Sequence, residues 1–321
     1  MKVLTDNTVF AENTAPETVG WRLLTKKEEI PGCPEAVLSR FFSRKRVWVG
    51  TLDWPLSWTC FFLVEESSFS QYDSLIELSR EHVRMEDGTV CLAGIGRDFH
   101  GQKKRPWISL PGNLHLSFYL KPNIILQNFG AAFMILGAAS VVQAIDEIEY
   151  MRGKAGIKWV NDILVDDAKV AGILTHTQSM EDMVTSAVIG VGINVEQDPS
   201  IRSDRFTGKT ASLRSLAVRK QDMNMAYVLK KFLYFMDANY QELKKGKVSR
   251  LLEFYRSRSV FMGKKVRVVS DKERGREKEI ACGRMTGIGE NLELYIEGFS
   301  KPISSGRIIV SPVKQKTYRF S

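Results

Sequence analysis

Apolar and polar positions follow regular patterns from residue 58 onwards, and these patterns predict both strands and helices. Short apolar or alternating runs predict strands, and longer runs with one charged side predict helices. Predicted strands cover residues 59–64, 89–93, 113–120, 163–165, 169–174 and 184–195. Predicted helices cover residues 74–84, 128–149, 223–244 and 248–258. The chain therefore combines a sheet with helices, and we expect the last three of these strands to form a meander.

The ends of the chain have a different character. Four short predicted strands follow residue 261 at regular spacing, which is typical of a small barrel-like β-domain. They cover residues 266–269, 279–282, 292–296 and 308–310. Residues 1–55 show no clear periodicity, and Pro31 and Pro34 argue against a helix-turn-helix there. We expect an N-terminal extension of unknown role over 1–55, a main domain over 56–260 and a β-domain over 261–321.

The bulk composition fits a large domain joined to a smaller one. Of the 321 residues, 44% are apolar, enough for two hydrophobic cores. The chain has no charge-free apolar run of about 18 residues, so we expect no membrane span. Its first residues lack the apolar stretch of a secretory signal. The four cysteines are scattered without a CxxC pair. Reduced thiols in the cytoplasm fit this spacing better than a disulfide framework or a zinc site.

The net charge of +9 is compatible with an anionic partner but does not require one. A basic protein binds nucleic acid, an anionic substrate or an acidic protein, and a solvated basic surface is the simplest alternative. Recognition of nucleic acid lacks support, because neither a recognition helix nor clustered aromatic residues for base stacking can be found. We do not expect DNA binding.

A glycine-rich basic loop is predicted over residues 94–105, between a strand and Trp107. Its glycines permit tight turns that present backbone N–H groups to an anion. Arg97, Lys103, Lys104 and Arg105 add positive charge, and arginine suits phosphate because its guanidinium binds in a bidentate manner. The loop matches neither a dinucleotide fingerprint nor a P-loop. Taken alone, it predicts an ordinary surface loop equally well.

Residues 158–162 place a lysine, an amide and a carboxylate at the start of an apolar strand. Polar groups in such a place must be paired or used. Lys158 could also extend to solvent, with Asp162 as its ion-pair partner. Gly172 and Gly192 follow on two later strands, where glycine permits another backbone or a ligand to approach closely. Together these segments suggest a small sheet around an anion-binding pocket.

The order of these segments resembles the biotin–protein ligases. The family's motifs are a GRGRRG-type loop leading to W-x-S-P-x-G-x-N-L-x-x-S, then K-W-P-N-D, K-x-x-G-I-L and G-x-G-I-N. The matching segments here run from Gly94 to Ser117, then 158–162, 169–174 and 190–194, and the resemblance covers roughly residues 58–313. The loop is expanded, Ile95 and Val160 replace an arginine and a proline of the family, and only half of an S-T-N motif is present.

The resemblance implies an α+β fold with a mixed sheet flanked by helices. This is the class II synthetase-like catalytic domain of biotin/lipoate ligases, joined to a small C-terminal SH3-like β-barrel. It also implies a biotin–[acetyl-CoA-carboxylase] ligase that uses ATP and Mg²⁺. Biotin would be activated to biotinyl-5'-AMP with release of pyrophosphate, and the biotinyl group would pass to a lysine of a biotin carboxyl carrier domain.

The resemblance also implies roles for individual residues. Lys158 would bridge the biotin carboxylate and the α-phosphate, and Arg97 would hold the adenylate phosphate, so these two are the expected catalytic residues. Asp162 would face the metal. The residues expected to bind biotin or the adenylate are Ser67, Ser68, Gly94, Gly96, Trp107, Asn161, Gly172, Ile173, Gly192, Ile193 and Asn194.

Two alternatives remain open at this point. A lipoate or octanoate ligase or transferase would share the fold, and the altered motifs around the ring of biotin keep that alternative in view. A non-catalytic regulator that binds biotin or nucleic acid is the second alternative. The identity of the acceptor is also open, as is the oligomeric state, for which a homodimer is one option.

Overall fold

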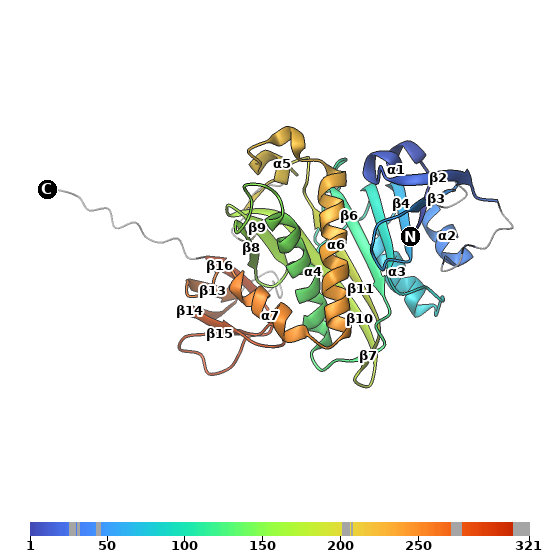
Figure 1. Ribbon diagram of the computed structural model, residues 1–321. Helices are drawn as coiled ribbons and strands as arrows, with labels where there is room; N and C mark the ends of the chain where they lie inside the picture. The colour runs from blue at the N-terminus through green and yellow to red at the C-terminus, as the bar shows by residue number, and fades with distance from the viewer. Residues whose placement is uncertain are drawn as a thin grey trace.

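A twelve-stranded mixed sheet forms the body of the molecule (Figure 1). The computed structural model describes residues 1–25, 30, 33–42, 46–200, 206, 208–270 and 278–310. The main path of the sheet runs β2-β3-β1-β4-β5-β6-β11-β10-β9-β8, with β12 paired to β10 and β7 paired to β11. β4 runs parallel to β1 and β5, and β12 runs parallel to β10, while the other pairs are antiparallel. The predicted mixed sheet is confirmed.

The strands agree with the sequence pattern wherever that pattern was regular. Their bounds are β1 (Lys2–Thr5), β2 (Thr18–Leu23), β3 (Trp48–Leu52), β4 (Cys60–Ser67), β5 (Thr89–Gly96), β6 (Leu114–Leu120), β7 (Ile124–Ile125), β8 (Ala155–Lys158), β9 (Asp162–Val165), β10 (Ala168–Met180), β11 (Met183–Ile193) and β12 (Lys209–Thr210). The expected meander is β9-β10-β11. Asp166 and Asp167 both have positive φ and form the tight turn between β9 and β10, a conformation that Asp tolerates.

Helices cover both faces of the sheet. Their bounds are α1 (Thr8–Thr14), α2 (Glu35–Phe42), α3 (Gln71–Arg80), α4 (Phe129–Asp146), α5 (Leu213–Leu216), α6 (Met225–Lys244) and α7 (Val248–Ser257). α4 and α6 lie side by side across one face, as Figure 1 shows. α2 and α3 pack on the other face, over the half of the sheet that holds β4 and β5.

Helix α4 is a core helix, as its apolar pattern predicted. By length and composition alone it would suffice to cross a membrane, but 78% of its 18-residue window is buried inside the molecule. A Cβ atom added at Gly137 would lie 2.9 Å from a methyl carbon of Ile173 on β10. Glycine at that position therefore allows the helix to pack closely on the sheet.

The N-terminal segment is part of the sheet, although the sequence left its role open. β1 lies between β3 and β4, so residues 2–52 extend the sheet by three strands. These strands have only four to six residues each. β2 at the edge is mostly exposed, so its apolar pattern is weak. Short strands without regular alternation give little signal in a sequence, which explains why the pattern missed them.

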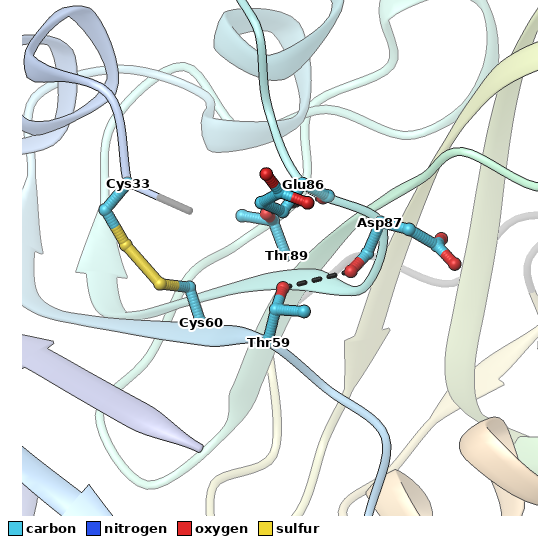
Figure 2. The surroundings of a disulfide bond; sticks show 6 residues. All are labelled: Cys33, Thr59, Cys60, Glu86, Asp87 and Thr89. Atoms are coloured by element: carbon cyan, nitrogen blue, oxygen red, sulfur yellow. Dashed lines mark hydrogen bonds between the residues drawn. A yellow bond between two sulfur atoms is a disulfide. The ribbon is translucent and has the colours of Figure 1, made fainter. Parts of the chain in front are cut away.

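The expectation of four reduced cysteines is wrong for one pair. Cys33 and Cys60 form a disulfide between the start of β4 and the segment that precedes α2 (Figure 2). Both cysteines are buried in an apolar cluster with Phe41 and Phe62. Their separation of 27 residues gave no hint of this contact, because it depends on where the N-terminal segment joins the sheet. Cys91 and Cys282 are free thiols.

A second, four-stranded antiparallel sheet lies at the C-terminal end of the described chain. Its order is β15-β14-β13-β16, with bounds β13 (Lys265–Val269), β14 (Glu279–Ile288), β15 (Leu294–Ile296) and β16 (Arg307–Val310). The indole N–H of Trp159 donates a 2.6 Å hydrogen bond to the carbonyl oxygen of Leu292, just before β15. The small sheet thus contacts the segment that follows β8.

Candidate active site

A cavity of about 160 Å³ lies on the face of the main sheet opposite α4 and α6. That is roughly ten times the ~10–15 Å³ that one water molecule needs by the same measure, so the space suits a ligand. The cavity is lined by strands β6, β10 and β11, the start of α3 and the segment 99–108. Its lining is mainly apolar with a few polar groups, as in most small-molecule sites.

A row of directly paired residues crosses the floor of this cavity. Lys158 on β8 pairs with Asp162 on β9, which pairs with Gly172 on β10, then with Gly192 on β11 and His115 on β6. Directly opposed residues lie on the same face of a sheet. The register therefore brings the predicted K-W-x-N-D, K-x-x-G-I-L and G-x-G-I-N segments together on one face.

The two floor glycines make room for Trp107. A Cβ atom at Gly192 would overlap the indole ring, and one at Gly172 would lie 3.4 Å from it. The indole N–H donates a 3.3 Å hydrogen bond to Nδ1 of His115. Glycine at these positions is thus explained by the close approach of a side chain, and the predicted residues Trp107, Gly172 and Gly192 all line the cavity.

Lys169 lines the cavity beside this row of paired residues. Its Nζ lies 2.6 Å from Oδ1 of Asp162 and 5.6 Å from the centre of the Trp107 ring. Lys169 and Asp162 are each only 18% exposed. A register shift between Lys169 and Ala171 adds a residue to β10, so Lys169 and Gly172 lie on the same side despite their odd spacing. Its place at the start of the K-x-x-G-I-L motif was the available signal, although Lys169 was not predicted as a site residue.

Lys158 lies farther from the centre of the cavity. β8 is three strands away from β11, which corresponds to about 14 Å between Cα positions. The Lys158 ammonium group donates a hydrogen bond to the carbonyl oxygen of Phe206. Lys158 itself does not line the cavity.

The predicted loop over 94–105 is partly strand. β5 continues to Gly96, so the loop begins at Arg97. A Cβ atom at Gly94 would lie 2.7 Å from the carbonyl oxygen of Glu65, which explains that glycine by packing. The Arg97 side chain is exposed, whereas Arg105 lines the cavity.

Arg105, which lines the cavity, lies near two other cations. Burial, followed by the positive charges of Arg105 and Arg307, lowers the pKa of Lys103. The smaller effects of Arg105 and Arg307 show that positive charge from the loop and from β16 acts on Lys103. Such a concentration of positive charge favours the approach of an anion.

The basic loop is held to the start of α3. Nε2 of His100 lies 2.8 Å from Oδ2 of Asp73, and Nζ of Lys104 lies 3.2 Å from the same oxygen. Asp73 stands in the first turn of α3, and its backbone N–H donates to the capping hydroxyl of Ser70. This cluster fixes the loop beside the cavity.

The other predicted residues divide between the cavity and its surroundings. Asn161, Asp162, Ile173 and Asn194 line the cavity. Ser67 is buried and its hydroxyl donates to the carbonyl oxygen of Phe69. Ser68 is exposed, Ile193 is buried, and neither lines the cavity. Instead, the following residues Ser70, Gln71 and Tyr72 do so.

Two buried amides at the cavity have polar atoms without protein partners. Within the described part of the chain, three of their atoms make no hydrogen bond. They are Oδ1 of Asn194 and both Oε1 and Nε2 of Gln71. Both residues are 2% exposed. Unsatisfied buried polar atoms are uncommon in native proteins, so these three atoms are candidates for ligand contacts. No group of three or more His, Cys, Asp and Glu able to hold a metal ion occurs among the described residues.

His115 is neutral at physiological pH. It is 5% exposed, and burial lowers its pKa from 6.5 to about 4, with a smaller opposing effect from a hydrogen bond to Leu110. Neutral imidazole can accept at Nδ1, where Trp107 donates, while it donates from Nε2 toward the carbonyl oxygen of Leu110. A neutral His115 therefore supports the position of Trp107.

Lowering the pH is expected to reduce the stability of the protein through His115. Below pH 6.5 His115 takes up a proton in the unfolded chain, whereas in the folded chain it does so only near pH 4. The stability that the folded protein has at neutral pH is therefore fully present above pH 6.5, and part of it is lost as the pH falls toward 4. Between pH 7.5 and 5.0 the loss amounts to about 2 kcal/mol. Urea unfolding of the protein and of His115→Gln at both pH values tests this, because the variant should lose less. Equal losses in both proteins would contradict it.

Comparisons with known proteins agree with this geometry. Residues 70–194 match the Biotin/lipoate A/B protein ligase family. The bifunctional ligase/repressor BirA of Bacillus subtilis is 36% identical over 157 residues, which cover 49% of this chain and 47% of that protein. The biotin–[acetyl-CoA-carboxylase] ligase of Mycobacterium tuberculosis is 27% identical over 184 residues, covering 57% of this chain and 65% of that protein.

A solved structure extends the likeness to most of the fold. The biotin protein ligase from Aquifex aeolicus, in complex with biotin and ATP, superposes with a TM-score of 0.57 at 22% identity, covering 77% of this chain and 97% of that one. The chain therefore has the mixed α+β fold of biotin protein ligases. Residues 70–194 are similar to the biotin/lipoate A/B protein ligase family, and the matched relatives carry the same likeness. It spans about half the length of the first curated relatives that it matches.

Proposed function

We propose that the protein is a biotin–protein ligase, which activates biotin with ATP and transfers it to a lysine of a carrier domain. The observation that carries the proposal is the cavity floor of Gly172 and Gly192, bordered by Lys169 and covered by Trp107. The segments that build it are those matched by the family. Related proteins named as biotin ligases support the choice of substrate.

In the first step, a carboxylate oxygen of biotin attacks the α-phosphorus of ATP. A bond forms between that oxygen and phosphorus, the bond from phosphorus to the bridging oxygen breaks, and pyrophosphate leaves. Two anions must meet, so the site needs fixed positive charge. Lys169 is suited to this task because it is held by Asp162 and Trp107, and a fixed cation needs little reorganisation during reaction.

In the second step, the lysine amine of the acceptor attacks the carbonyl carbon of the mixed anhydride. An amide bond forms, the carbon–oxygen bond to AMP breaks, and the amine loses a proton. The anhydride must be kept from water until the acceptor arrives. The loop after β5 would help to exclude water, because contacts with Asp73 hold His100 and Lys104 at the start of α3.

The roles expected for Lys158 and Arg97 remain part of the proposal. Lys158 lies at the far end of the cross-strand row, where it is suited to contact the nucleotide phosphates more than biotin. Arg97 is exposed at the start of the loop, and Arg105 from the same loop lines the cavity. We assign the contact with the adenylate phosphate to this loop, with Arg105 nearer the ligand.

Mg²⁺ would enter this site with ATP. Mg²⁺ bound to nucleotides usually takes one or two protein oxygens along with phosphates and water. Asp162 and the unpartnered Oδ1 of Asn194 are oxygen donors of the right kind in the cavity lining. When bound, the ion would offset the charge of the triphosphate.

Several finer assignments belong to the same proposal. The four-stranded C-terminal sheet would be an SH3-like barrel, and the acceptor would be a biotin carboxyl carrier domain. Carrier domains that are acidic would be attracted by the net charge of +9. The expected cytoplasmic location also belongs to this proposal. DNA binding is not part of the proposal.

The proposal is tested by incubating the protein with ATP, radiolabelled biotin and a carrier domain. We expect label in the carrier only when ATP is present, and none in a carrier whose acceptor lysine is replaced by arginine. Labelled lipoate serves as the parallel substrate. Transfer of lipoate without transfer of biotin would replace the proposal by a lipoate ligase, and binding of biotin without transfer would indicate a regulator.

A further inference from the structure

Gln71 has an unusual environment at the cavity. It is the first residue of α3, it lines the cavity, and it is 2% exposed. Neither its amide oxygen nor its amide nitrogen has a hydrogen-bond partner among the described residues. Its backbone is fixed by the start of α3, where the hydroxyl of Ser70 caps the helix. The side chain is therefore a buried, well-positioned amide without a protein partner.

Such an amide is costly unless something binds it. A buried polar group without a partner costs about 1–3 kcal/mol relative to a satisfied one, and native proteins rarely carry one without a reason. Gln178 on β10 shows the usual arrangement, because its amide oxygen accepts from the hydroxyls of Ser79 and Ser186. The contrast between these two glutamines indicates that the side-chain amide of Gln71 binds a ligand.

The chemistry of the amide indicates the kind of group that it binds. A primary amide offers one acceptor oxygen and a donor nitrogen side by side. Its complement is a group with an adjacent C=O and N–H, as in an amide or a cyclic urea. A dithiolane ring such as that of lipoate has no N–H donor and only weak acceptors, so it would leave both atoms of Gln71 unsatisfied.

The neighbouring residues indicate which end of the ligand lies there. Tyr72 packs over Gly190, since a Cβ atom at Gly190 would lie 2.9 Å from its ring. Lys169 lies near Gly172, which pairs with Gly192. Gly190 and Gly192 are two residues apart on β11, or about 7 Å. A ligand with its ring near Gln71 thus directs its carboxylate toward Lys169.

We infer that Gln71 is the residue that determines specificity for the ring of the acyl substrate, by pairing its side-chain amide with a cyclic urea. This inference rests on the proposed function. It predicts that the site selects biotin against lipoate, and it assigns the reacting carboxylate to the Lys169 end of the cavity.

Binding measurements on Gln71→Met test the inference. Methionine keeps the length of the side chain but offers no hydrogen bond to a urea. We expect the Kd of biotin measured by calorimetry to rise about 10- to 100-fold, in line with loss of hydrogen bonds to a buried polar ligand. Dethiobiotin, which keeps the urea and lacks the sulfur, should lose a similar factor. The KM for biotin should rise while kcat at saturating biotin and the KM for ATP change little.

Gln178→Met is the matched control. It removes an amide that already has protein partners, so it should lower the unfolding midpoint in urea and leave the Kd of biotin unchanged. Gln71→Met should unfold at the same urea concentration as the unmodified protein or higher, because an unsatisfied amide is removed. This difference separates a role in recognition from a role in structure.

The outcomes distinguish the inference from the proposed function. If the unmodified protein ligates biotin and Gln71→Met binds biotin within threefold of it, the inference about Gln71 is overturned while the function stands. If Gln71→Met loses affinity for dethiobiotin and biotin alike, the inference is supported. If the unmodified protein binds neither compound but binds lipoate, the proposed function fails first and the inference fails with it.

Discussion

Replacing Lys169 with methionine is expected to lower kcat/KM for adenylate formation about 10²- to 10³-fold, the range found when a fixed charge that stabilises a transition state is removed. The ammonium group of Lys169 lies in the cavity lining, held 2.6 Å from Asp162 and over the ring of Trp107. Exchange of labelled pyrophosphate into ATP in the presence of biotin measures this step without the acceptor.

Two companion variants make the Lys169 result specific. Lys169→Met leaves Asp162 partly buried without its cation, so Asp162→Asn in the same chain should restore stability without restoring exchange. Lys158→Met tests the residue first expected to act on the α-phosphate. Its Nζ donates to the carbonyl oxygen of Phe206, and we expect a smaller loss of exchange. If Lys158→Met abolishes exchange and Lys169→Met retains it, the central cation is Lys158.

The difference between these two lysines shows what the sequence could predict about the site. The ordered motifs brought Gly172, Gly192 and Asp162 to one place correctly, because a strand register follows from alternation and tight turns. The position of Lys169 depends on a register shift in β10, which alternation does not show. A single added residue turns its side chain to the cavity face of the sheet.

Local sequence patterns also predicted some parts of the fold and missed others. Helix α4 and strand β11 were predicted closely, because long apolar or alternating segments give strong signals. The insertion of β1 between β3 and β4, and the disulfide between Cys33 and Cys60, join segments far apart in the chain. Such pairings depend on tertiary packing and have no local signature.

Replacing Gly192 with alanine is expected to displace Trp107 and to destabilise the protein by about 1–3 kcal/mol, the usual cost of overpacking. The added methyl group would overlap the indole ring, which would have to move away from Nδ1 of His115 and from Lys169. Since the indole also lines the cavity, the affinity for biotin should fall at least tenfold (about 1.4 kcal/mol). Urea unfolding and calorimetric titration with biotin measure the two effects.

Gly130→Ala is the matched control for this substitution. Gly130 lies in the first turn of α4, and a Cβ atom there would meet nothing within 4 Å. Alanine stabilises a helix by about 0.5–1 kcal/mol relative to glycine, so Gly130→Ala should raise the unfolding free energy and leave the affinity for biotin unchanged. If Gly192→Ala instead bound biotin as tightly as the unmodified protein, the position of the indole over Gly172 and Gly192 would not shape the biotin site.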